Sequence, residues 1–174
     1  MSLFDKFTKK KRDAGIRLAH SSHVAEEVFY GDGAFRTSFR VNDAFRPAKS
    51  HAGEVEMLHT YAPHEEFGTE GAYPYLALQC DDGVYGAVEA FRETGEIPGA
   101  LELAPLSGTF CFRAKIEYYG RLMYFYGMDR CRGEAEIQGL CLVYPKALGG
   151  TEDERKLATV LDEAAESFRE EREA

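Results

Sequence analysis

Apolar and polar side chains alternate most regularly between residues 109 and 119, which predicts a β-strand with one buried face. The apolar row of this strand comprises Phe110, Phe112, Ala114, Ile116 and Tyr118. Residues 119–122 contain a glycine and predict a tight turn into an antiparallel strand at residues 122–126. A third strand at residues 140–144 ends before Pro145, so this part of the chain predicts a sheet on which the C-terminal helix packs.

The first half of the chain carries a separate hairpin pattern. Residues 27–41 contain an apolar run, a turn signal at Gly31-Asp32-Gly33 and a second run in which apolar and polar side chains alternate. The stretch that follows contains Pro47 and is interpreted as a loop.

Two more strands are predicted before the first helix. Residues 54–61 alternate, and His59 shares the apolar row of this strand with Tyr61. Residues 73–80 are short and mostly apolar, which is typical of a strand buried on both faces. The polar, glycine-containing residues 62–72 between them indicate a loop.

Two stretches have the apolar spacing of helices that pack on a sheet. The first begins at an N-cap supplied by Asp81 or Asp82 and ends at Thr94-Gly95. The second follows two glycines and begins with a capping box formed by Thr151 and Glu154. Its apolar stripe comprises Leu157, Leu161, Ala164, Ala165 and Phe168. The order of elements predicts an α+β fold, a mainly antiparallel sheet with an internal helix and a C-terminal helix packed on it.

The charge distribution divides the 174 residues into a basic N-terminal arm, residues 1–14, and a single domain, residues 15–174. Residues 1–12 carry five basic side chains against Asp5, a net charge of +4, beside Leu3, Phe4 and Phe7. This arm either packs loosely on the domain or touches a membrane surface, and it is too short for firm membrane binding alone. No apolar stretch is long enough for stable membrane insertion.

The whole chain has a net charge of −9, which excludes a general nucleic-acid binder and is compatible with a basic partner. The four cysteines lie far apart with no C-x-x-C motif, and we expect all of them to be reduced in a cytoplasmic protein. Cys131 lies between Arg130 and Arg132, so a reactive thiol is left open there.

No catalytic, nucleotide or metal motif is present, and we predict no cofactor and no metal. His20 and His23 have the spacing of two ligands on a helix, but exposed histidines near a helix start are the favoured interpretation. The densest acid–base group is in the loop at residues 62–72. There His64 and Glu66, together with Asp82, support an alternative hypothesis of a small-molecule-binding or hydrolytic enzyme. A solvated acidic loop and a helix cap explain the same residues.

Aromatic side chains gather on the predicted hairpin at residues 118–126. Tyr119, Tyr124, Phe125 and Tyr126 are candidates for a recognition surface, because tyrosines offer large contact areas, although burial in the core is the other interpretation. The leading hypothesis is a non-enzymatic cytoplasmic domain, like an immunity protein or a chaperone, that binds another protein, with a basic partner as one form of it. The oligomeric state is left open.

Residues 108–169 resemble the fold group of Mog1, PsbP and DcrB-like proteins. The resemblance is carried by the late hairpin, the strand after it and the final amphipathic helix that ends at Ser167-Phe168-Arg169. It implies a compact α/β/α sandwich with a binding or accessory role. The beginning of the chain, residues 1–11, is similar to that of many small bacterial proteins. No functional residues carry over, because these families have no shared active site.

Overall fold

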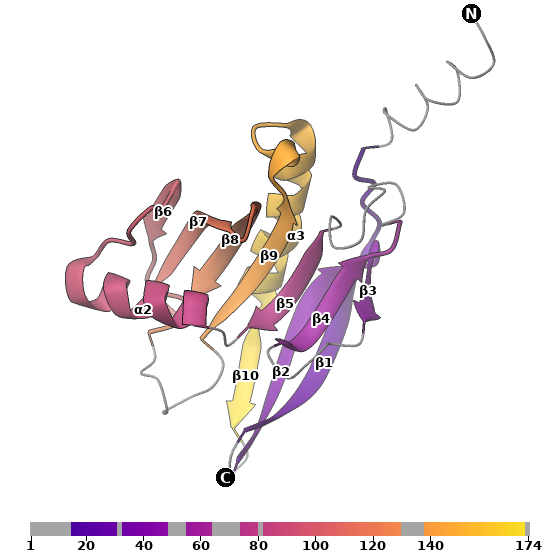
Figure 1. Cartoon of the computed structure of the whole chain (residues 1–174). Coiled ribbons are helices and arrows are strands. Elements are labelled where there is room, and N and C mark those ends of the chain that lie inside the picture. The colour runs from indigo at the N-terminus through magenta and orange to yellow at the C-terminus, as the bar shows by residue number, and fades with distance from the viewer. Residues whose placement is uncertain are drawn as a thin grey trace, which may run out of the picture.

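The computed structural model describes residues 15–30, 33–48, 55–63, 74–79, 82–129 and 138–172. These residues form an α+β fold of antiparallel sheets with one internal helix and one C-terminal helix, which confirms the predicted class (Figure 1). The elements are β1 (Ser21–Tyr30), β2 (Gly33–Asn42), β3 (Phe45–Ala48), β4 (Val55–Tyr61), β5 (Tyr75–Gln79), α2 (Asp82–Thr94), β6 (Glu102–Pro105), β7 (Phe112–Tyr118), β8 (Arg121–Gly127), β9 (Gly139–Pro145), η2 (Lys146–Leu148), α3 (Glu152–Ser167) and β10 (Arg169–Arg172).

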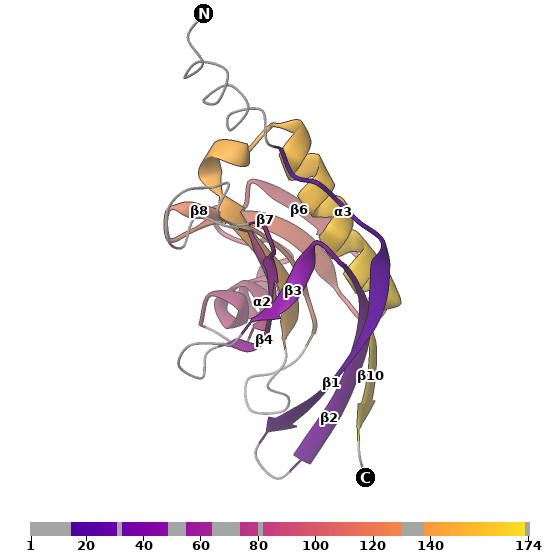
Figure 2. The ribbon, with the colours of Figure 1, turned by 90° about the vertical axis from the view of Figure 1, so that its right-hand side faces the viewer.

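The described strands make two sheets. The larger has seven strands in the order β3-β4-β5-β9-β8-β7-β6, and the smaller has three in the order β1-β2-β10. Helix α2 packs on one face of the larger sheet, whereas α3 and the smaller sheet cover the other face (Figure 2). The larger sheet is therefore buried on both faces, which explains why β8 and β9 are almost continuously apolar.

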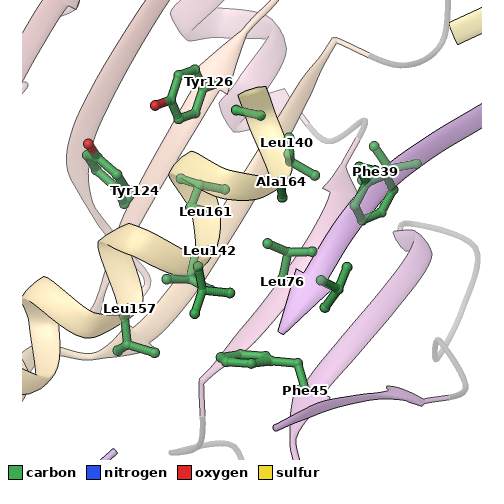
Figure 3. Close-up of a cluster of buried hydrophobic side chains, with 14 of the residues drawn as sticks. Phe39, Phe45, Leu76, Tyr124, Tyr126, Leu140, Leu142, Leu157, Leu161 and Ala164 are labelled. Atoms are coloured by element: carbon green, nitrogen blue, oxygen red, sulfur yellow. The ribbon is translucent and has the colours of Figure 1, made fainter. Parts of the chain in front are cut away.

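Alternate residues of each central strand enter two separate cores. In β8, Leu122, Tyr124 and Tyr126 face α3, while Met123 and Phe125 face α2. Figure 3 shows the core on the α3 side, where Leu157, Leu161 and Ala164 of the helix meet the side chains of the sheet. The predicted apolar stripe of the C-terminal helix is confirmed by the burial of all five of its members.

The turn between β7 and β8 consists of Tyr119 and Gly120. Their φ angles are +46° and +76°, and the flanking Tyr118 and Arg121 pair across the hairpin. Positive φ at both loop residues is what a type I′ hairpin turn requires, and asparagine or glycine adopts it most readily. The hairpin was predicted, but the row of apolar residues was wrong at Phe110. This residue precedes the strand and packs on the α3 side against Tyr126.

Three strands were missed, and each lies at the edge of a sheet. Strands β3 and β6 contain Pro47 and Pro105, and an edge is where a strand tolerates a residue without an N–H. The prediction of a loop around Pro47 was therefore wrong. Strand β10, sequence REER, pairs with β2 through its backbone and has no apolar pattern to indicate it.

The predicted capping box of α3 is shifted by one residue. The Thr151 hydroxyl accepts a hydrogen bond from the Glu154 N–H at 3.4 Å, as expected. The Glu154 carboxylate returns to the Gly150 N–H at 3.0 Å, because the Thr151 N–H already donates to the carbonyl of Leu148.

Candidate functional site

The four aromatic candidates of the β7–β8 hairpin lie in three different environments. Tyr119 is 90% exposed at the tip of the hairpin, where its ring meets that of Tyr118 edge-on, with 4.7 Å between the centroids. Phe125 is fully buried in the core beneath α2. Tyr124 and Tyr126 are buried beneath α3 (Figure 3). Of the four, only Tyr119 exposes its ring to solvent.

Tyr124 and Tyr126 direct their hydroxyl groups to Asp162 of α3. The Tyr126 hydroxyl donates to Asp162 Oδ1 at 2.6 Å, and the Tyr124 hydroxyl lies 3.5 Å from the same oxygen. Arg113 lies 3.8 Å from this oxygen and 5.4 Å from the centre of the Tyr124 ring. Burial, together with the Asp162 charge, raises the pKa of Tyr124 and raises that of Tyr126 to about 12. Both phenols therefore keep their protons at neutral pH, and the cluster fastens α3 to the sheet.

A second polar cluster fastens the start of α3. The Glu154 carboxylate accepts hydrogen bonds from the Tyr144 hydroxyl at 2.7 Å and from Lys115 at 3.5 Å, in addition to the Gly150 N–H. Lys115 also lies 3.1 Å from Glu102 of β6. Burial acts to raise the pKa of Glu154, but these donors outweigh it and hold the pKa below its ordinary value. The cluster links β6, β7, β9 and α3.

The opposite face of the larger sheet carries an open apolar groove of about 680 Å³. We call it the α2 groove. It lies between α2, the connection from α2 to β6, and β7, and it is lined by Gly86, Ala87, Ala90, Ile97, Pro98, Gly99, Leu101, Ile116 and Glu117. Small side chains on α2 keep it open, because a Cβ atom added at Gly86 would meet no atom within 4 Å.

The α2 groove continues toward the exposed turn. Ile116 of the groove and Tyr118 beside the turn are alternate residues of β7, and both pack at the margin of the α2-side core. Leu101 is 54% exposed on the groove wall. Along β7, Tyr118 therefore lies between Ile116 of the groove and the exposed ring of Tyr119 at the turn.

The residues of the alternative enzyme hypothesis are not tested by the described structure. His64 and Glu66 lie outside the described residues. Asp82 begins α2, and its side chain is outside them as well. His20 and His23 are exposed, but they lie before and within β1 and not on a helix, so that part of the prediction was wrong.

The described residues hold no cluster of three or more histidine, cysteine or acidic side chains that could bind a metal ion. Cys111 is a free thiol, and the Cys141 thiol lies 3.5 Å from the carbonyl oxygen of Ala77, whereas Cys80 and Cys131 lie outside the described residues. Burial, followed by the charge of Asp129, raises the pKa of Cys111 and disfavours its reactive thiolate. In the part of the chain that the structure describes, no helix has the length and apolarity to cross a membrane.

Sequence reasoning missed the α2 groove. Its walls come from three segments that lie up to thirty positions apart, and none of them carries a motif. The small residues Gly86 and Ala90, four positions apart in α2, were the available signal, because they place a gap on one face of the helix.

No protein-family model matches this chain, and neither a curated protein nor a solved structure does. The resemblance to the Mog1, PsbP and DcrB-like group therefore stays a prediction.

Proposed function

We propose that this chain is a non-enzymatic binding domain that contacts a partner protein through the α2 groove and Tyr119. The observation that carries the proposal is the combination of exposure and backbone strain at Tyr119. The residue is 90% exposed, and its φ of +46° lies in the left-handed region. A non-glycine residue there costs about 1–2 kcal/mol, and asparagine would fit the turn better. A tyrosine kept in a strained and exposed position is explained by contact with another molecule.

The neighbouring groove supports a protein partner. Tyrosine is one of the residue types that dominate binding energy in protein interfaces, and it acts best beside apolar surface that excludes water. Leu101 and Ile116 provide such surface between α2 and the turn. A partner that covers the groove would remove apolar side chains from water and cover the Tyr119 ring at the same time.

The polar clusters among the described residues are explained by a structural role. The Tyr126 hydroxyl donates to Asp162 and three donors engage Glu154, so each cluster holds α3 on the sheet. Both clusters lie on the α3 side, across the sheet from the α2 groove.

A comparative pull-down tests the proposal. The bait is the full chain, and partners retained from the native host are identified by mass spectrometry. Two variants alter the proposed surface, Tyr119→Asn and Leu101→Ser. The matched control is Leu106→Ser, because Leu106 is also an exposed leucine, 41% exposed, but follows β6 whereas Leu101 precedes it.

The expected result is one partner that the wild type and Leu106→Ser retain equally and that both surface variants lose. Tyr119→Asn should also be as stable as the wild type or up to about 1 kcal/mol more stable, because asparagine relieves the turn. Loss of the partner from Leu106→Ser as well, or its retention by both surface variants, would contradict the proposed surface.

A further inference from the structure

Acidic side chains border the α2 groove. Glu89 and Glu93 are exposed on α2, and each follows a lining residue, Gly86 or Ala90, by three positions, which makes them neighbours on the helix surface. Glu96 precedes Ile97 of the lining and is exposed too. Glu117 contributes to the lining, but it alternates with Ile116 and Tyr118 and pairs with Leu122 of the α3-side core, so its carboxylate lies on the other face. We call the carboxylates of Glu89, Glu93 and Glu96 the acidic rim.

The one basic side chain of α2 is engaged by a carboxylate outside the acidic rim. Arg92 of α2 is directed to Asp129, with 2.9 Å between Nε and Oδ1. The three glutamates give the acidic rim a formal charge of −3.

An apolar groove with a negative rim selects its partner by chemistry. Binding is favoured when apolar side chains fill the groove, because apolar surface leaves water. It is also favoured when lysine or arginine side chains replace solvent counter-ions around the rim. A neutral segment could fill the groove but would make no favourable charge interaction with the rim, and an acidic segment would be repelled by the rim.

Resting on the proposed function, we infer that the α2 groove binds a segment of a partner protein in which apolar side chains are flanked by lysines or arginines. The apolar side chains lie over Gly86 and Leu101, and the basic side chains meet the acidic rim. The chain itself contains a segment of this chemistry, residues 1–12, with Leu3, Phe4 and Phe7 among five basic residues.

A synthetic peptide of residues 1–12 is the probe for a binding titration followed by fluorescence anisotropy. Two altered peptides accompany it, one with its basic residues replaced by glutamate and one with its three apolar residues replaced by serine. The protein is the full chain. We expect the unaltered peptide to bind and both altered peptides to bind at least about tenfold more weakly. Binding should also weaken by about tenfold between low salt and about 0.5 M NaCl, because the rim is exposed.

Three protein variants locate the site of the peptide. Glu89→Lys combined with Glu93→Lys reverses part of the rim and should weaken binding by about tenfold. Gly86→Leu fills the groove without loss of the fold, because the position is open and leucine favours a helix, and it should reduce binding as strongly. Glu166→Lys on α3 makes a single charge reversal at an exposed site on the opposite face and should leave binding within about twofold.

The outcomes separate this inference from the proposed function. Equal binding of the unaltered and glutamate peptides, no binding of any peptide, or full binding by the rim variant would overturn the inference. If the pull-down partner is lost from Tyr119→Asn and Leu101→Ser but kept by the rim variant, the proposed function stands and the inference is wrong. Self-association of the full chain that the rim variant abolishes would support the inference, with a second copy as the partner.

Discussion

His59 is a buried polar side chain in the core, and replacing it should change how stability depends on pH. It is 1% exposed, and neither ring nitrogen has a hydrogen-bond partner. Its ring meets Phe39 of β2 edge-on, with 6.3 Å between the centroids, and Phe39 in turn stacks on Phe168. The imidazole therefore lies in apolar surroundings where the smaller sheet packs on the larger one.

Burial lowers the pKa of His59 below its ordinary value of 6.5, so the folded state holds the ring neutral. The unfolded chain binds a proton at this residue once the pH falls below 6.5, whereas the folded chain does not. The lowered pKa of His59 therefore leaves the free energy of unfolding unchanged above pH 6.5. It reduces the free energy of unfolding as the pH drops below 6.5. The loss is about 1.4 kcal/mol per pH unit for as long as the folded imidazole stays neutral.

The assay is urea denaturation at several pH values from about 7.5 to about 5.5 for the wild type, His59→Leu and His23→Gln. The leucine variant should lose less stability than the wild type over this range, by up to about 1.4 kcal/mol. At the upper pH it should be no less stable, because it removes two unsatisfied buried atoms. His23→Gln should follow the wild type, because His23 is exposed on β1. Parallel curves for the wild type and His59→Leu would refute the reasoning.

Two further changes test how α3 and the central strands are held. Glu154→Gln should lower the free energy of unfolding by about 1–3 kcal/mol, because it weakens three hydrogen bonds at a largely buried carboxylate. Glu152→Gln, at an exposed ion pair of the same helix, should cost no more than about 0.5 kcal/mol in the same denaturation assay. Gly139→Ala should destabilise by about 1–3 kcal/mol, because its Cβ would lie 2.7 Å from the carbonyl oxygen of Tyr126. Gly86→Ala should instead stabilise by up to about 1 kcal/mol in thermal unfolding, since its position on α2 is open.

The parts of the fold that were predictable from the sequence are those that local chemistry determines. The turn at Tyr119-Gly120, the stop of α2 at Gly95 and the cap of α3 at Thr151 each depend on a few adjacent residues. The alternation of residues 54–61 also placed His59 with Tyr61, and both are buried on the same side of β4. The alternation could not show that the ring nitrogens of His59 lack hydrogen-bond partners, because their surroundings depend on which strand of the smaller sheet packs against β4.

The rest required tertiary contacts that no local pattern encodes. Strands β3 and β6 are short and contain proline, so only pairing with a longer neighbour makes them strands. The tyrosines of β8 looked alike in the sequence, yet docking of α3 buried Tyr124 and Tyr126 and gave both a shared acceptor, Asp162. Tyr119 stayed outside because the turn carries it beyond the sheet.

The two faces of the larger sheet are covered to different extents, and this difference connects stability with the proposed function. On the α3 face, a 16-residue helix and the smaller sheet cover the core, and polar clusters at Asp162 and Glu154 anchor the helix. On the other face, the 13-residue α2 presents glycine and alanine toward β7 and leaves the α2 groove open. Substitutions that disturb the anchors should therefore change stability and leave partner binding intact in the folded fraction. Substitutions that fill or recharge the groove should do the reverse, since exposed positions there contribute little to the core.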